Sequence, residues 1–143
     1  MRQWVDAGAF SIETLYGIGL LNEPFMRGYE NVLFQDFYPK GYGAVRKHFS
    51  AEETNVFMDM SSMGVNDFSG LYDDYFGVVI DAHKYQSFEF NHWAEEPDAW
   101  SKHKAQACRF SQDISGSPLD VIVGEWSLAI TDCQVIEIKK NKK

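Results

Sequence analysis

Four short, continuously apolar runs divide the chain, and each of them turns polar at its C-terminal end. Continuous rather than alternating hydrophobicity is typical of strands that are buried on both faces of a parallel sheet. The runs occupy residues 15–21, 55–60, 77–83 and 120–126. We therefore predict four parallel strands, each buried on both faces.

The segments between the runs are long enough for helices that connect parallel strands. We expect such crossover helices within 30–49 and 95–108, whereas Ser-Ala-Glu-Glu at 50–53 lies so close to the second run that we expect a turn there. The runs follow one another at unequal intervals that average about 34 residues, which matches the strand–helix unit of an eight-unit barrel. The sequence thus predicts an α/β fold with about half of the units that close a barrel.

The composition fits a folded domain and restricts its partners. The 143 residues are 45% hydrophobic and 15% aromatic, which is typical of a globular chain rather than a disordered one. There are 13 Lys+Arg against 21 Asp+Glu, for a net charge of −8, and lysines concentrate in the tail at 139–143. Because so acidic a body repels phosphate groups, we expect no nucleic acid and no anionic membrane as partner.

No apolar stretch approaches the roughly 20 residues of a membrane-spanning helix, and the N-terminus lacks the pattern of a secretory signal. The sequence contains two cysteines. Cys108 and Cys133 permit one disulfide, but two partly buried thiols explain them as well. The cysteines therefore do not indicate the redox compartment.

Two glutamates, Glu23 and Glu125, each follow closely on the apolar core of a run, the first and the fourth. In parallel α/β barrels this end of the strands holds the active site, and about three strand–helix intervals place the two residues across the barrel mouth from each other. One protonated and one ionised carboxyl form the pair that cleaves a glycosidic bond, with retention where they are about 5 to 5.5 Å apart. The alternative, two solvated loop residues, is disfavoured by their matching positions.

Three segments carry a family resemblance: Leu-Leu-Asn-Glu-Pro at 20–24, Ile-Asp-Ala-His-Lys-Tyr-Gln at 80–86 and Val-Gly-Glu-Trp-Ser at 123–127. In this order they resemble glycoside hydrolase family 5, and within it the fungal-type exo-β-1,3-glucanases. The resemblance covers roughly residues 12–133. It implies a partial (β/α)8 TIM barrel, about strands 4 to 7 with their crossover helices, over 1–133, followed by an unrelated basic tail at 134–143.

The resemblance also implies roles for individual residues. Glu23 would be the acid/base on the fourth barrel strand, and Glu125 the nucleophile on the seventh. Asn22 would bind the sugar 2-hydroxyl. His83 and Tyr85 would line the subsite where the bond is cleaved, with Tyr85 hydrogen-bonded to the nucleophile.

Several other side chains have two alternative roles, in binding substrate or in packing. Phe88 and Phe90 are candidate platforms for a sugar ring, with core packing as the alternative. Trp126 is expected to pack beneath the nucleophile, with a direct contact to substrate as the alternative, and His83 has a structural alternative as a buried histidine. A zinc site formed by His83, His92 and one carboxylate is disfavoured because the histidine spacing is not that of a metal site. We expect no metal and no organic cofactor.

The chain also departs from the family pattern. Of the His-Asp-Ala-Phe motif on the fifth strand it retains only Asp59, which weakens the inference of β-1,3 specificity. The segments that supply the first three strands and the eighth strand are missing, so we expect an internal piece of a larger hydrolase. Such a piece has open barrel edges and a tendency to self-associate.

We therefore expect a retaining O-glycosyl hydrolase that acts on β-glucan, of the glucan 1,3-β-glucosidase type, which the resemblance places outside the cell. A second hypothesis is a catalytically inactive truncated fragment of such an enzyme. A third, a small α/β binding domain, would need a phosphate-cradling glycine loop, and neither Gly17-Ile18-Gly19 nor Gly41-Tyr42-Gly43 has the rest of that motif.

Overall fold

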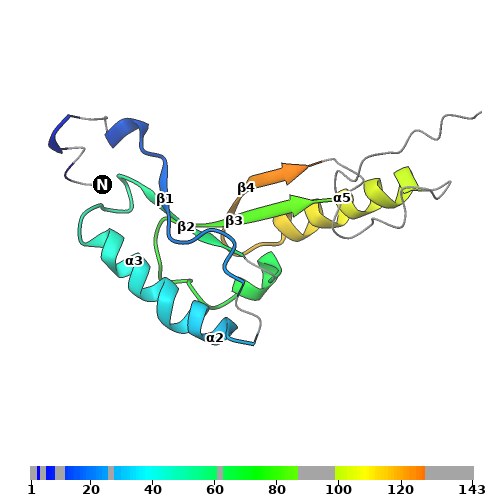
Figure 1. Cartoon of the computed structure of the whole chain (residues 1–143), viewed down its shortest axis with the longest axis horizontal. Helices are drawn as coiled ribbons and strands as arrows, with labels where there is room; N and C mark the ends of the chain where they lie inside the picture. Colours follow the sequence, from blue (N-terminus) through cyan, green and yellow to red (C-terminus); the bar gives the residue numbers. More distant parts are fainter. Residues whose placement is uncertain are drawn as a thin grey trace, which may run out of the picture.

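The computed structural model describes residues 3, 6–8, 12–25, 28–60, 63–86 and 99–127. Its centre is a four-stranded parallel sheet in which every strand lies beside the one that precedes it in the chain (Figure 1). The strands are β1 (Gly17–Gly19), β2 (Asn55–Asp59), β3 (Val78–Tyr85) and β4 (Asp120–Ser127). The prediction of an α/β fold with four parallel strands is confirmed.

The first strand is shorter than its apolar run. Only Gly17–Gly19 is extended, although the Tyr16 carbonyl accepts the Asn55 N–H and the Leu20 N–H donates to the Phe57 carbonyl, both at 3.1 Å. Gly17 is required at this place because a Cβ there would overlap the Phe57 ring. Two glycines in three positions leave little side chain to pack, which explains why the regular strand is so brief.

A nearly continuous helical segment follows β1, as predicted for 30–49. It consists of α2 (Glu30–Val32), the wider-turned η2 (Leu33–Phe37) and α3 (Tyr38–Arg46). A separate short turn, η1 (Ile12–Thr14), precedes β1. The predicted turn at 50–53 is also present, closed by the Ser50 N–H to Glu53 Oε2 at 2.8 Å. Between β2 and β3 the described residues contain one 3-10 turn, η3 (Val65–Phe68).

The last helix, α5 (Ala99–Ser115), confirms the helix predicted at 95–108 from residue 99 onward and continues beyond its expected end. It stops before Gly116 and Ser117, a common way for a helix to end. Residues 95–98 lie outside the described residues. So do Cys133 and the predicted boundary at 133/134, whereas Cys108 is exposed on α5.

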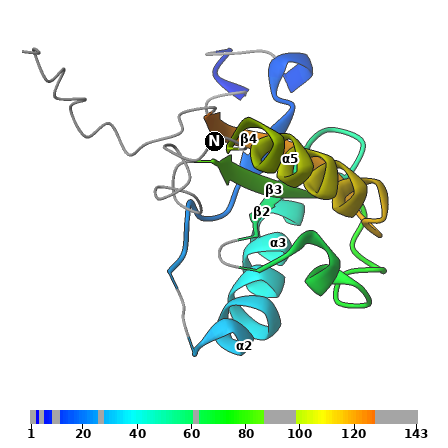
Figure 2. The ribbon, with the colours of Figure 1, turned by 90° about the vertical axis from the view of Figure 1, so that its right-hand side faces the viewer.

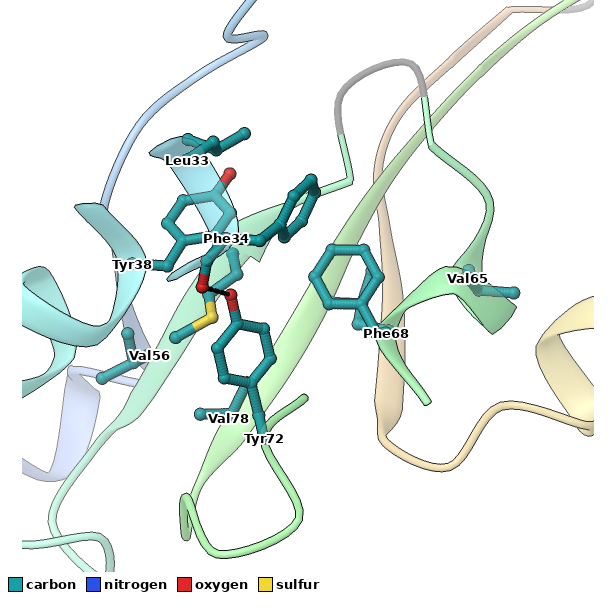
Figure 3. Packing of buried hydrophobic residues seen from close by; sticks show 10 residues of the cluster. Leu33, Phe34, Tyr38, Val56, Val65, Phe68, Tyr72 and Val78 are labelled. Atoms are coloured by element: carbon teal, nitrogen blue, oxygen red, sulfur yellow. Dashed lines mark hydrogen bonds between the residues drawn. The ribbon is translucent and has the colours of Figure 1, made fainter. Parts of the chain in front are cut away.

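The main core lies between one face of β2 and β3 and the α2–η2–α3 segment (Figure 3). Two buried tyrosines tie these layers together. The Tyr38 hydroxyl donates to the Asp59 carbonyl at 2.6 Å, and the Tyr72 hydroxyl donates to the Phe34 carbonyl at 2.6 Å. Burial raises the pKa of both phenols, so they remain donors throughout the ordinary pH range. The end of β2 is thereby fixed to the helix above it.

Helix α5 lies along β3 and β4 in both views (Figures 1 and 2). The Lys84 ammonium lies 5.4 Å from the centre of the Phe110 ring of α5. Lys84 lies four residues after Ile80 on β3, so the two side chains are on the same face of the sheet. Because Ile80 belongs to the main core, α5 covers the same face as α3. The described helices that pack on the sheet therefore lie on one face, and Asp59, Asp81 and His83 lie on the other.

The expectation of strands buried on both faces is wrong for β1, none of whose three residues is buried, and for β4. The side chains of β4 are exposed or half-buried, with Val123 40% and Trp126 65% exposed. β4 is an outer strand of the described sheet and has β3 as its neighbour there. So exposed a side chain does not pack beneath Glu125, and the expectation for Trp126 is wrong as well. Among the described residues, no helix combines the length and the apolar character needed to cross a membrane.

Candidate active site

Polar side chains gather on the face of the sheet that the helices leave open, near the carboxyl ends of the strands. Asp59 of β2 is the register partner of Asp81 of β3, and both alternate with core residues on the opposite face. His83 and Tyr85 continue the same side of β3. The strand ends thus bring these residues to the edge at which active sites of parallel α/β barrels are found.

Glu23 lies in the loop after β1, and its backbone is unusual. Its φ is 43°, and within the described ranges it is the one non-glycine residue with a positive φ. Its N–H donates to Asp59 Oδ2 at 2.7 Å, while its half-exposed side chain places Oε1 2.9 Å from His83 Nδ1. The following Pro24 is buried. Glu23 therefore turns its carboxylate over the open face of the sheet.

Glu125 reaches the same place through an irregularity in β4. The register passes from Val123 opposite Ala82 directly to Glu125 opposite His83, so that Gly124 is a bulge residue. Unbroken pairing would instead set Glu125 opposite Lys84, on the face that α5 covers. The bulge thus moves Glu125 to the side of His83.

Asp81 holds this bulge. Its Oδ1 accepts the Gly124 N–H at 3.1 Å, and a Cβ on Gly124 would overlap the Asp81 carboxylate. Glycine is therefore the residue type that allows this contact. Burial raises the pKa of the Asp81 carboxyl, although the neighbouring His83 imidazole opposes that shift.

His83 is the centre of the cluster, and its side chain is only 9% exposed. Nδ1 lies 2.9 Å from Glu23 Oε1 and 3.6 Å from Glu125 Oε2, and Nε2 lies 3.7 Å from Asp59 Oδ2 and from Asp81 Oδ1. Burial alone would lower the pKa of His83. The hydrogen bond with Glu23 and the charges of the other three carboxylates outweigh burial, so the pKa of His83 is raised.

Tyr85 contacts Glu125 directly. Its hydroxyl donates to Glu125 Oε2 at 2.5 Å, a charge-assisted hydrogen bond. Because this bond retains the phenolic proton, the pKa of Tyr85 is raised. The structure therefore contains the tyrosine–carboxylate contact that the resemblance implied.

The remaining predicted site residues are less informative. Asn22 is exposed beside Glu23 in the loop after β1. Phe88, Phe90 and His92 lie outside the described residues, so neither the aromatic platform nor the zinc site with His92 can be placed.

One oxygen each of Glu23 and Glu125 and one ring nitrogen of His83 lie within 4.8 Å of one another. This spacing fits either a bridging cation or a pair of carboxylates that act together on one bond. In the described structure these groups already contact protein: Glu23 is bonded to His83, and Glu125 to Tyr85. The contacts thus provide no orphaned ligand that calls for a metal.

Sequence reasoning missed two members of the cluster. The amino-acid pattern alone assigns no role to Asp81 and marks Asp59 only as the remnant of a motif, yet each holds a backbone N–H at or beside a glutamate. A signal was present, because both aspartates stand at the polar end of an apolar run. The bulge at Gly124 has no comparable signal, since it depends on how two strands pair.

Comparison with known proteins relates the chain to enzymes of one kind. It is 34% identical over 123 residues to a glucan 1,3-beta-glucosidase of Blumeria graminis, 31% identical over 121 residues to one of Schwanniomyces occidentalis and 29% identical over 130 residues to one of Lachancea kluyveri. Each match covers 85% of this chain and 28% of the relative. The chain therefore spans about 28% of the length of these curated relatives and is similar to one part of them. No protein-family model matches it.

Proposed function

We propose that this chain supplies the catalytic carboxylates of a retaining β-glucan hydrolase, of the type that releases glucose from β-1,3-glucan. One observation carries the proposal: one carboxylate oxygen of Glu23, in the loop after β1, and one of Glu125, on β4, lie within 4.8 Å of each other, although β1 and β4 are the two outer strands of the described sheet. Retaining glycosidases have carboxyl groups about 5 to 5.5 Å apart, and inverting ones need roughly 6.5 to 9.5 Å to admit a water molecule. The similarity to glucan 1,3-beta-glucosidases agrees with this assignment.

In the proposed mechanism, Glu125 attacks the anomeric carbon while Glu23 donates a proton to the departing glycosidic oxygen. A covalent glycosyl-enzyme forms, and Glu23 then removes a proton from the water that hydrolyses it. Tyr85 keeps one oxygen of Glu125 engaged and so leaves the other to attack. His83 contacts the Glu23 carboxylate at the same time.

The finer assignments follow from the same proposal. The strands β1 to β4 correspond to strands 4 to 7 of a (β/α)8 barrel of glycoside hydrolase family 5, ending near residue 133, with 134–143 as a separate tail. Asn22 binds the sugar 2-hydroxyl, and Phe88 offers a face to a sugar ring. The reaction needs no metal and no organic cofactor, and the enzyme acts outside the cell.

A second candidate is a chain that retains the carboxylate pair without turnover. It is favoured by the exposure of Val123 and Trp126 on β4, since a strand of a closed barrel is flanked on both sides. The two candidates share every residue of the cluster and differ in activity alone.

The test is hydrolysis of laminarin, a β-1,3-glucan, with glucose release measured for the purified chain. We expect Glu125→Gln and Glu23→Gln to lower the rate at least about a thousandfold, because each removes a group that acts in the reaction. The matched control Glu52→Gln changes an exposed carboxylate in the turn before β2 and should leave the rate unaltered.

Covalent labelling separates the candidates further. A 2-deoxy-2-fluoroglucoside with a good leaving group should add one glycosyl group to Glu125, visible as a mass increase that peptide mapping places on 123–127. A folded chain with neither hydrolysis nor labelling would favour the inactive candidate. Labelling without laminarin hydrolysis would retain the mechanism and exclude this substrate.

A further inference from the structure

Each of the two glutamates is tied to an aspartate through main chain rather than through its own side chain. The Glu23 N–H donates to Asp59 Oδ2 at 2.7 Å, and the N–H of Gly124, directly before Glu125, donates to Asp81 Oδ1 at 3.1 Å. A carboxylate that accepts a backbone N–H forms one of the stronger hydrogen bonds in proteins. Both bonds therefore act on the chain positions that determine where the glutamates point.

Asp59 has a rigid place from which to act. It is 2% exposed, it ends β2, and its carbonyl accepts the Tyr38 hydroxyl from the helical layer at 2.6 Å. The backbone that it holds, at Glu23, has a φ of 43°, which costs free energy for a residue with a side chain. A buried acceptor at a fixed place selects this conformation over the extended ones that Glu23 would otherwise adopt.

Asp81 acts on the other glutamate by a different route. Its bond to Gly124 lies at the register shift between Ala82 and His83, where β4 gains its extra residue. This shift decides which face of the sheet receives Glu125. The carboxylate of Asp81 occupies the space that a side chain at position 124 would need, so carboxylate and glycine fit each other.

The two aspartates are register partners on neighbouring strands, and His83 Nε2 lies 3.7 Å from a carboxylate oxygen of each. The cluster thus has two levels: aspartates at the sheet, glutamates above them, and the His83 ring between. Since β2 and β3 are fixed by their own pairing, the distance between the aspartates is set by the sheet.

We propose that Asp59 and Asp81 are positioning residues, which set the separation of Glu23 and Glu125 by holding the main chain at Glu23 and at Gly124. This inference rests on the proposed function for its catalytic meaning. Its structural content, which residue holds which amide, stands apart from activity and is tested separately.

The first experiment is nuclear magnetic resonance of the amide groups in the 143-residue chain. We expect the Glu23 and Gly124 amide protons to resonate downfield and to exchange slowly with solvent. Asp59→Ala should abolish the downfield shift and the slow exchange of the Glu23 amide proton and leave the Gly124 amide unchanged. Asp81→Ala should abolish them at Gly124 and leave Glu23 unchanged. In each variant we expect exchange to be about tenfold faster at the released amide. Asp59→Asn and Asp81→Asn retain an acceptor oxygen and should restore much of the protection.

A matched control comes from another carboxylate of the same chain. Asp67 Oδ2 accepts the Gly64 N–H at 2.7 Å at the start of η3, on an exposed turn. Asp67→Ala should release the Gly64 amide and leave those of Glu23 and Gly124 as they are. Unchanged Glu23 and Gly124 amides in the two aspartate-to-alanine variants would overturn the proposal, whether or not the chain hydrolyses glucan.

The second experiment compares two leaving groups, because acid catalysis matters little when the leaving group needs no proton. Asp59→Ala should lower kcat/KM for laminarin about a hundredfold, the cost of a misplacement of roughly 1 Å, and kcat/KM for a dinitrophenyl β-glucoside much less, whereas Asp59→Asn, which keeps an acceptor oxygen, should restore much of the activity on laminarin. Asp81→Ala should slow both substrates alike, since it displaces the nucleophile. Equal losses for both aspartates on both substrates would assign them a general structural role and overturn the positioning proposal.

Discussion

At the scale of single residues, the cluster depends on how closely Gly124 and Asp81 fit together. A Cβ at position 124 would overlap the Asp81 carboxylate. Gly124→Ala should therefore lower the free energy of unfolding by about 1–3 kcal/mol, the usual cost of overpacking, measured by urea denaturation. Gly19→Ala, on the same sheet with no heavy atom within 4 Å of its Cβ, is the control and should be nearly neutral.

The same pair allows a double-mutant cycle. In an Asp81→Ala background the clash partner is gone, so Gly124→Ala should cost markedly less there than in the parent chain. If the two costs simply add, the contact between Asp81 and Gly124 is not the reason for the glycine.

The charge on His83 leads to a pH dependence. The pKa of His83 is raised above the ordinary value of about 6.5: burial opposes the shift, but the hydrogen bond with Glu23 and the charges of the other carboxylates prevail. A raised pKa in the folded state means that the protonated ring stabilises the fold. This contribution is complete below about pH 6.5 and is lost as the pH rises through the folded-state value.

His83→Gln measures that contribution. We expect the parent chain to exceed the variant in free energy of unfolding by the largest margin at about pH 5.5 and by the smallest at about pH 8.5, with urea denaturation as the assay. The groups that face the ring are Glu23, Asp59, Asp81 and Glu125. A margin that grows with pH would show that the ring is held neutral.

At the scale of elements, α3 contains two glycines in different surroundings. A Cβ at Gly43 meets no heavy atom within 4 Å, whereas a Cβ at Gly41 would lie 2.8 Å from Leu20 Cδ1. Alanine gains helix propensity equally at both, so Gly43→Ala should raise the free energy of unfolding by about 0.5–1 kcal/mol. Gly41→Ala should gain less because Leu20 must move.

Thermal and urea denaturation of both variants check this, and Leu20→Ala provides the background in which the two glycine replacements should become equivalent. Equal gains in the parent chain would mean that Leu20 adapts without cost, and that α3 does not pack tightly against the loop after β1.

The elements also show how far the amino-acid pattern determines the fold. Apolar runs predicted all four strands and their parallel pairing, because burial on a sheet demands hydrophobic side chains whatever the details. The short β1 was not predicted, because Gly17 and Gly19 do not interrupt the apolar run around them. The exposure of β4 was not predicted either, because an apolar run does not show whether its strand has a neighbour on both sides in the described sheet. The length of α5 was underestimated, because a helix end depends on residues such as Gly116 more than on apolar spacing.

The site residues were predictable where their position depends only on lying at the end of a strand. They were not predictable where their position depends on how two strands pair. Glu23, His83 and Glu125 meet as strand-end placement suggested. The bulge that turns Glu125 to the correct face and the left-handed backbone of Glu23 are properties of three-dimensional pairing. Asp59 and Asp81 stand at polar strand ends that the sequence shows, but the backbone amides that they hold lie on segments remote in sequence, so their roles were not predictable.

At the scale of the whole molecule, an outer strand with exposed apolar side chains meets a strong net negative charge. β4 exposes Val123, and the net charge of −8 opposes contact between copies. We expect the apparent mass in light scattering to rise with protein concentration, and to rise more at high salt, since salt shortens the screening length from about 10 Å at 0.1 M to about 3 Å at 1 M.

Val123→Lys should suppress this association by placing charge on the sheet edge. Val32→Lys is its control, because Val32 is a similarly exposed valine on α2, away from β4. Equal suppression by both variants would indicate unspecific hydrophobic contact in place of pairing through β4.

The order β1-β2-β3-β4 has a consequence for how the chain is made. Within the described sheet, β2, β3 and β4 each pair with the strand synthesised just before it, so each of these three strands meets a partner that has already been made. Glu23 is translated first and Glu125 last, with Asp59, Asp81 and His83 in place between them. The pair of glutamates is thus completed only when β4 joins the described sheet, after Asp59, Asp81 and His83 have been synthesised.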